Sequence, residues 1–322
     1  MSRKSSYLHP MQIRKAVAED LPAIICLLKA SLGESMIPKS EQLWKWKHED
    51  NPFGKSPVLV ADDKGIICGV RVFLRWEFRQ GESVIKACRA VDTAIHPDYQ
   101  GKGIFKSLTL SLIEELKAEG VDLIYNTPNT ESMPGYLKMG WEKWGKLPLK
   151  MHFNLNVGKS KNLIQVSDWK SIEGLIRKVE CSNSNSEQIQ TNPVPGYLHW
   201  RYCNCPLFPY HYISDKETYL LIYRIKEGQL GKELRIVDFY ELPGFGINEK
   251  KQLNIRLKTI QKIQKVRFTS FSGLRIHKNS PIKLGISPVL SIGPEVTLRK
   301  VSSVGDPVKM PWAWSLGDLE VF

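Results

Sequence analysis

Alternating apolar and polar residues predict β-strands through the first half of the chain, and apolar residues at helical spacing predict the helices between them. In the longest helical pattern the apolar positions recur at Ile104, Leu108, Leu112, Ile113 and Leu116. Glycine-containing turns at residues 62–65 and 80–82 join neighbouring strands. The predicted strands cover residues 11–16, 58–61, 66–79, 87–95, 121–126 and 147–153, and the predicted helices cover 21–32, 41–49 and 104–118.

The second half continues the pattern less regularly and indicates a second domain. Helices are predicted over residues 169–179 and 248–264, and a strand over 265–270. Between the halves, the polar run 182–195 is typical of a surface connection. Because 322 residues are too many for one ordinary core, we expect three segments: a domain over 1–155, a connection over 156–195 and a domain over 196–322.

A strand, a tight glycine loop and a helix follow one another within residues 87–118. His96-Pro97 ends the strand, since proline has no N–H to donate to the ladder. Gly101-Lys102-Gly103 then opens the helix, where backbone N–H groups and the helix dipole favour an anion. The pattern predicts a phosphate cradle, although the spacing is neither that of a P-loop nor that of a dinucleotide-binding fingerprint.

The loop resembles the acetyl-CoA loop of the GNAT N-acetyltransferases, whose pattern is Arg or Gln, two residues, Gly, one residue, and Gly or Ala. Gln100 and Gly103 match that pattern, and Phe105 departs from it at the last position. The Phe105 ring either crowds the pyrophosphate side of the loop or packs inward.

A second stretch resembles the next motif of the same family. Asn129 is followed at the family's spacing by Tyr136, and then by Lys138-Met139-Gly140-Trp141. Two motifs in the right order are more specific than either alone. The resemblance covers residues from about 11 to 155, a little under half of the chain.

The resemblance implies the GNAT fold, an α/β architecture with a mixed, mostly antiparallel sheet flanked by helices, and acetyl-CoA as co-substrate. In that family the central strand splays from its neighbour, so the backbone of Ile95 would meet the amides of the cofactor. Asn129 would hydrogen-bond the pantetheine arm or the loop, with an Asx turn as the alternative. Lys102 would add a point charge unless it points to water. The pyrophosphate would lie on Gln100, Gly101, Lys102, Gly103, Ile104 and Phe105.

Acetyl transfer from a thioester to an amine requires a neutral amine, a donor for the oxyanion and an acid for the departing thiolate. The resemblance assigns the acid role to Tyr136, whose phenol is protonated at neutral pH. Asp92 lies on the central strand just before the cofactor end. Burying a carboxylate costs free energy, so a buried one is expected to be paired or to take part in catalysis. It either deprotonates the amine, directly or through water, or pairs with an arginine such as Arg89.

The second half faintly repeats the first. Residues 43–47 (LWKWK) resemble residues 197–201 (YLHWR), and Asp92 and Pro97 recur at the same spacing as Asp238 and Pro243. We therefore expect a second, degenerate GNAT-like copy at the C-terminus. Gly244-Phe245-Gly246 is shorter and apolar, so this copy would lack the cofactor motif and serve as scaffold or substrate wall.

Composition and charge limit which classes of partner, metal site and location are expected. The net charge is +13, but lysine and arginine are spread along the chain and no nucleic-acid-binding motif is evident, so no nucleic acid is expected as partner. The six cysteines are scattered without metal-ligand spacing, so we predict no metal and a reducing, cytoplasmic location. No apolar run approaches the roughly 20 residues of a membrane helix, and no signal peptide is expected. The oligomeric state stays open.

The sequence favours a cytoplasmic N-acetyltransferase that moves an acetyl group from acetyl-CoA to a primary amine. The acceptor would be a small molecule, an amino sugar or a peptide, and direct attack in a ternary complex needs no nucleophilic cysteine. The alternative is a non-catalytic module that binds CoA or an acyl carrier, and nucleic-acid binding driven by charge is a third class.

Overall fold

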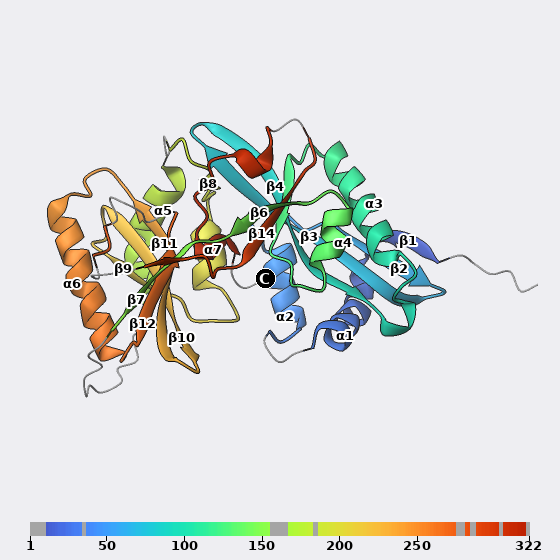
Figure 1. The fold of residues 1–322 in the computed structure, drawn as a ribbon, viewed down its shortest axis with the longest axis horizontal. Helices are drawn as coiled ribbons and strands as arrows, with labels where there is room; N and C mark the ends of the chain where they lie inside the picture. The colour runs from blue at the N-terminus through green and yellow to red at the C-terminus, as the bar shows by residue number, and fades with distance from the viewer. Residues whose placement is uncertain are drawn as a thin grey trace, which may run out of the picture.

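A computed structural model describes residues 11–33, 37–154, 167–182, 186–274, 281–283, 288–302 and 305–319 of the chain. Its strands form two sheets, each flanked by helices (Figure 1). The parts of the predicted connection at 156–166 and 183–185 lie outside the described residues. Within the described part of the chain, no helix combines the length and apolar character needed to cross a membrane.

The first sheet runs in the order β1-β2-β3-β4-β5-β14-β6, and β8 pairs with β3. Neighbours are antiparallel except β4 and β5, which are parallel because the helix α3 (Ile104–Ala118) connects them. The strands are β1 (Gln12–Lys15), β2 (Val58–Asp63), β3 (Ile66–Gln80), β4 (Ser83–Ile95), β5 (Leu123–Asn126), β6 (Glu142–Lys146), β8 (Gln190–Thr191) and β14 (Glu295–Lys300).

The second sheet runs in the order β13-β7-β12-β11-β10-β9. Its pairs β9–β10 and β10–β11 are antiparallel, and β11–β12 is parallel across the helix α6 (Ile247–Ile263), which repeats the order β2, β3, β4, α3, β5. The two sheets therefore support the predicted second GNAT-like copy. The strands are β7 (Leu149–Phe153), β9 (His211–Ser214), β10 (Tyr219–Gly228), β11 (Gly231–Glu241), β12 (Phe268–Ser272) and β13 (Val289–Leu290).

The two halves exchange strands. The strand predicted over residues 147–153 forms as β7, but it pairs with β12 and β13 in the second sheet rather than closing the first half. In return, β14 comes from the end of the chain and inserts between β5 and β6 of the first sheet. Figure 1 shows green β7 among orange and yellow strands, and red β14 beside green β6.

Shorter helical segments connect the strands and cover the sheets. The helix predicted over 41–49 divides into α2 (Glu41–Trp44) and the π-helical turn η2 (Lys45–Glu49), and the one predicted over 169–179 divides into η4 (Trp169–Ile172) and α5 (Glu173–Cys181). The remaining segments are η1 (Ala18–Asp20), α1 (Leu21–Leu32), η3 (Pro97–Tyr99), α4 (Met133–Lys138), η5 (His199–Cys203), η6 (Pro307–Lys309) and α7 (Leu316–Leu319).

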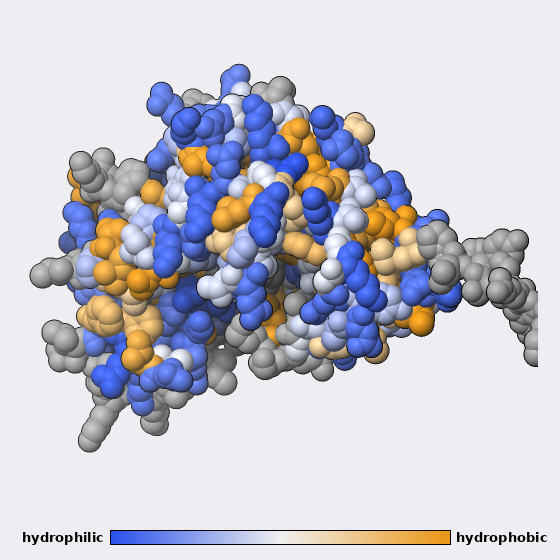
Figure 2. Space-filling view, turned by 45° about the vertical axis from the view of Figure 1, so that its right-hand side comes forward, coloured by the Kyte–Doolittle hydropathy of each residue, from blue (hydrophilic) through white to orange (hydrophobic). Residues whose placement is uncertain are grey.

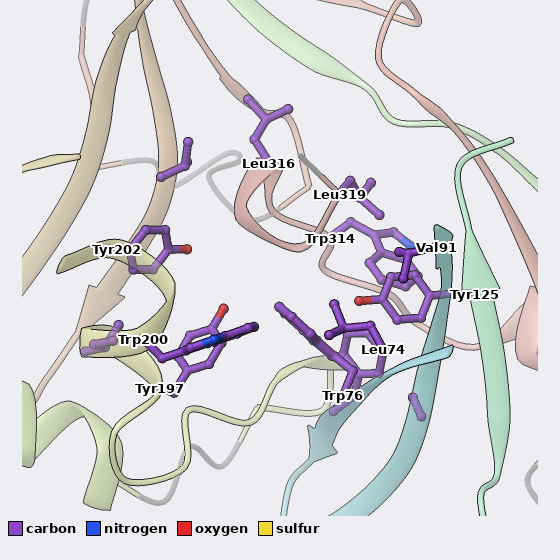
Figure 3. Close-up of a cluster of buried hydrophobic side chains, with 14 of the residues drawn as sticks. Leu74, Trp76, Val91, Tyr125, Tyr197, Trp200, Tyr202, Trp314, Leu316 and Leu319 are labelled. Atoms are coloured by element: carbon purple, nitrogen blue, oxygen red, sulfur yellow. The ribbon is translucent and has the colours of Figure 1, made fainter. Parts of the chain in front are cut away.

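The alternation along β3 sends its side chains to two separate cores. Val70, Val72 and Leu74 join the core beneath α1, whereas Phe73 joins the core beneath α3. The core beneath α1 continues into the second half, where Trp76 packs edge-to-face on Tyr197 with ring centroids 5.8 Å apart (Figure 3). One hydrophobic core thus joins the two sheets.

On the outside, the face seen in Figure 2 is hydrophilic over most of its area, with hydrophobic patches scattered between the polar residues. Exposed large apolar side chains occur singly in distant elements, such as Ile66 on β3 and Ile255 on α6. Single exposed apolar residues are ordinary on globular proteins.

Candidate active site

The cavity at the centre of the first sheet exists because β4 and β5 diverge. The two strands pair only from Ala87 to Arg89 on β4, while β4 stays paired with β3 as far as Ile95. Beyond Arg89 a cavity of about 670 Å³ opens between residues 89–95 and the segment 126–136. This is the splayed strand that the resemblance implies.

A β-bulge shapes the middle of this open edge. Val70 pairs with Ala94 and Val72 with Val91, so Asp92 and Thr93 together lie opposite Arg71. Asp92 has a φ of +40°, in the left-handed region that few residues other than glycine adopt. Bulges re-aim side chains, and here Asp92 and Thr93 both line the cavity.

Two residues of the π-helical turn η2 contact the carboxylate of Asp92. Its Oδ2 lies 2.5 Å from the Nζ of Lys47 and 3.0 Å from the Nε2 of His48. Burial would raise the pKa of Asp92, but the charge of Lys47 and the hydrogen bonds of His48 and Lys47 outweigh it and hold the pKa far below its usual range. These contacts favour the anionic form of Asp92 and make it a weak base.

Arg89, the partner considered for Asp92 from the sequence, turns to other elements. Its guanidinium donates to the backbone carbonyls of Asp318 and Leu319 at 3.0 and 2.8 Å, and to Thr127 at 3.1 Å. Asp92 pairs with Lys47 and His48 instead of the arginine that the sequence suggested.

The glycine loop has room for an anion at the start of α3. Gly101 and Gly103 have φ values of +75° and +77°, and a Cβ on either would meet no atom within 4 Å. The first turn of α3 carries neither an acidic residue nor a side-chain cap. In the second copy, by contrast, Glu249 closes the start of α6 by accepting from the N–H of Gly246 at 2.9 Å. Only the first copy leaves its helix start open.

The other loop residues take distinct positions. The Nε2 of Gln100 donates to the carbonyl of Ile95 at 3.4 Å, and the Nζ of Lys102 lies 4.5 Å from the centre of the half-buried Tyr99 ring. The side chain of Ile104 is buried in the core beneath α3, so only its backbone faces the loop. Gln100 and Phe105 line the cavity, and the glycine loop between them lies at its rim.

The side chains of Tyr136 and Phe105 contact each other at the wall of the cavity. The Phe105 ring packs inward, edge-to-face on Tyr136 with centroids 5.5 Å apart, and a Cβ on Gly135 would lie 3.1 Å from it. The Tyr136 hydroxyl accepts a hydrogen bond of 2.8 Å from Arg71, while its side chain lines the cavity and is 6% exposed. Of the two orientations considered for Phe105, the structure has the inward one.

Asn129 forms the Asx turn that the sequence left as the alternative. Its Oδ1 accepts from the backbone N–H and the hydroxyl of Ser132, at 2.8 and 2.7 Å, which starts the segment leading into α4. Asn129 is exposed at the rim of the cavity. The cavity thus brings together six of the predicted site residues: Asp92, Ile95, Gln100, Phe105, Asn129 and Tyr136.

Sequence reasoning missed Arg71, Lys47 and His48. Arg71 is a charged residue inside an apolar strand, which is the one local signal that marked it. Lys47 ends the tryptophan-containing run 43–47 and His48 follows it; the repeat was visible there, but the contact of these two residues with Asp92 was not.

Comparisons with known proteins agree with this geometry. A family model described as an acetyltransferase (GNAT) domain matches residues 12–144, which span β1 to β6 and contain the splayed strands, the glycine loop and Tyr136. No curated protein sequence matches the chain significantly.

Solved structures resemble the fold at low sequence identity. A probable N-acyltransferase from Enterococcus faecalis V583 has a TM-score of 0.67 at 15% identity, over 90% of this chain and 73% of that one. A GCN5-related N-acetyltransferase from Anabaena variabilis ATCC 29413 has a TM-score of 0.62 at 15% identity, over 91% and 73%. A putative acetyltransferase from Pyrococcus horikoshii has a TM-score of 0.54 at 13% identity, over 99% and 98% of the two chains.

These structures share the two-sheet fold, and the family model identifies the half that carries the cavity. Residues 12–144 therefore match a GNAT acetyltransferase domain, and the fold of the chain resembles that of solved GNAT-type structures.

Proposed function

We propose that this protein is an N-acetyltransferase that moves an acetyl group from acetyl-CoA to a primary amine by direct attack in a ternary complex. The observation that carries the proposal is the unpaired edge of β4 between Arg89 and Ile95. That edge lines one cavity together with Gln100 and Phe105, which flank the open helix start, and with Tyr136. The acceptor class is an amine of a small molecule, an amino sugar or a peptide.

Residues 100–105 would hold the pyrophosphate of acetyl-CoA. Backbone N–H groups at an uncapped helix start attract an anion, and Lys102 adds a positive charge at the rim. The pantetheine arm would follow the free edge of β4 toward Asp92, with the backbone of Ile95 and the side chain of Asn129 beside it. The open space above Gly101 and Gly103 supports this fit.

Tyr136 is the proposed acid. When the amine nitrogen attacks the acetyl carbon, the tetrahedral intermediate collapses, the carbon–sulfur bond breaks, and the thiolate takes the proton of the phenol. Asp92 faces the same cavity as an anion and attracts the ammonium form of the acceptor. Since its low pKa makes it a weak base, proton removal from the amine through water beside Asp92 fits its contacts better than direct removal.

The test combines binding with turnover. Acetyl-CoA should raise the melting temperature of the protein, and adding a panel of amines should release free thiol. Tyr136→Phe should lower kcat by about 100-fold with little change in acetyl-CoA binding. Tyr125→Phe is the matched control, because the buried hydroxyl of Tyr125 has no hydrogen-bond partner. Equal turnover in Tyr136→Phe and wild type would remove the acid role.

A non-catalytic CoA- or acyl-carrier-binding module remains the second candidate. Two observations favour it: Lys47 and His48 both contact the Oδ2 of Asp92, and the Phe105 ring lies at the cavity wall beside Tyr136. Stabilisation by acetyl-CoA without thiol release over the whole amine panel would support the module and contradict the transferase.

A further inference from the structure

Arg71 is a fully buried cation beside the proposed acid. It lies on β3 with 0% exposure, and among the described residues it forms no ion pair with a carboxylate. Its Nη1 donates to the Tyr136 hydroxyl at 2.8 Å and to the Thr93 hydroxyl, while Nε and Nη2 have no hydrogen-bond partner. A buried cation without a counter-charge costs free energy, so its retention calls for a reason.

The fold fixes this guanidinium in place. Arg71 follows the alternation of β3 onto the same face as Phe73, and the bulge on β4 turns Thr93 toward it. The guanidinium carbon lies 4.4, 5.3 and 5.7 Å from the ring centres of Phe73, Tyr136 and Phe105. Aromatic faces attract cations and leave the planar group little freedom to turn.

We propose that Arg71 is a positioning residue for Tyr136 in acetyl transfer, an inference that rests on the proposed function. Because Nη1–H occupies a lone pair of the phenol oxygen, the hydroxyl hydrogen points away from Arg71 and is free to face the cavity. In the transfer step the O–H bond of Tyr136 breaks and an S–H bond forms on CoA. The positive charge of Arg71 offsets the negative charge left on the phenolate until water returns the proton.

A purely structural role is the competing explanation, because Arg71 also fills space between aromatic rings. Arg71→Met keeps most of that volume and removes the donor and the charge. Arg299→Met on β14 is the matched control: the guanidinium of Arg299 lies 5.2 Å from the ring centre of Trp141, its Nε is buried without a partner, and no contact joins it to the Tyr136 hydroxyl.

The kinetic test is a double-mutant cycle. Arg71→Met should lower kcat by about 10- to 100-fold and leave the KM for acetyl-CoA within about twofold, whereas Arg299→Met leaves both unchanged. In the Tyr136→Phe background, Arg71→Met should lower kcat by less than about twofold, because residues that act as a unit are not additive. Arg71→Lys, which keeps the charge and one donor, should recover part of the rate. An equal loss in both backgrounds would overturn the proposal.

A second measurement separates this inference from the proposed function. With Cζ-labelled tyrosine, the resonance of Tyr136 is identified by its absence in Tyr136→Phe. It should shift in Arg71→Met and stay in place in Arg299→Met, because the hydrogen bond to the phenol oxygen is lost only in the former. If wild type shows no turnover but the resonance shifts, the transferase fails and the positioning contact stands. An unmoved resonance in Arg71→Met overturns the positioning role.

Discussion

At the scale of single residues, the cavity depends on charges that are buried and paired across long distances in sequence. Lys47 and Asp92 are 45 residues apart; Lys47 is buried beside His48, and Asp92 contacts both from the wall of the cavity. Burial lowers the pKa of Lys47 and of His48, and Asp92 opposes both shifts. The three groups therefore stabilise one another, and removing one leaves the others without compensation.

Asp92→Asn should destabilise the protein by about 3–5 kcal/mol, because it leaves the buried ammonium of Lys47 without its anion. Urea denaturation followed by circular dichroism measures this loss. Lys309→Met, at the exposed pair with Asp306, is the control and should leave the midpoint in place. A midpoint for Asp92→Asn within error of wild type would show that the pair contributes nothing net.

His48 predicts how stability depends on pH. Its pKa is lowered in the folded chain, so the unfolded chain binds the proton first as the pH falls below about 6.5. The contribution of neutral His48 to the free energy of unfolding is fully present above that pH. Below it, the free energy of unfolding decreases by at most about 1.4 kcal/mol per pH unit. Denaturation measured from pH 8 to pH 5 should show this decrease in wild type and a smaller one in His48→Gln. Parallel curves would argue against a neutral buried His48.

At the scale of elements, the two copies meet through equivalent turns. The π-helical turns η2 and η5 occupy corresponding positions, and their tryptophans exchange hydrogen bonds: Trp46 donates to the carbonyl of Trp200 at 2.7 Å, and Trp200 donates to that of Trp46 at 2.6 Å. The rings stack with centroids 5.3 Å apart. Because η2 also carries Lys47 and His48, the second copy supports the turn that holds Asp92.

Trp200→Phe should therefore cost about 1–3 kcal/mol more than a tryptophan-to-phenylalanine change that breaks no hydrogen bond, because it leaves the buried Trp46 carbonyl without its donor. Trp314→Phe is that comparison, since the Nε1 of Trp314 is buried without a partner. Both variants are compared with wild type by thermal and urea denaturation. Equal losses would mean that the exchanged hydrogen bonds contribute nothing beyond ring packing.

The elements that could be predicted from the sequence are those with local signals. Each of these signals lies within a few residues of the element that it predicts. They are the apolar positions of α3, the proline at the end of β4, the two glycines of the loop and the motif around Tyr136. The contact of Arg71 with Tyr136 spans 65 residues and depends on a bulge that alternation does not reveal. The π-helical turns were not predicted either, because a single turn with i→i+5 hydrogen bonds is too short to set an apolar period of its own.

At the scale of the whole molecule, the exchange of β7 and β14 could not be predicted because both strands fit either slot by pattern. Leu149, Met151 and Phe153 alternate with polar residues, as Val296 and Leu298 do on β14. Which sheet a strand joins is decided by distant partners. β14 fills its slot well: Leu298 pairs with Tyr125, and the hydroxyl of Thr297 donates to the side-chain oxygen of Asn126. The predicted segments 1–155 and 196–322 each hold a strand of the other's sheet.

This exchange predicts that residues 1–155 do not fold alone. Without β14, the edges of β5 and β6 lose their ladder partners, and the apolar side chains that pack against Val296 and Leu298 are exposed. The fragment should show no cooperative unfolding in urea. Fusing residues 288–302 to it through a flexible linker should restore a cooperative transition, and the same fusion with Val296→Asp and Leu298→Asp should not. A cooperative transition in the bare fragment would mean that β7 occupies the vacant slot, and the exchange would then not be needed for folding.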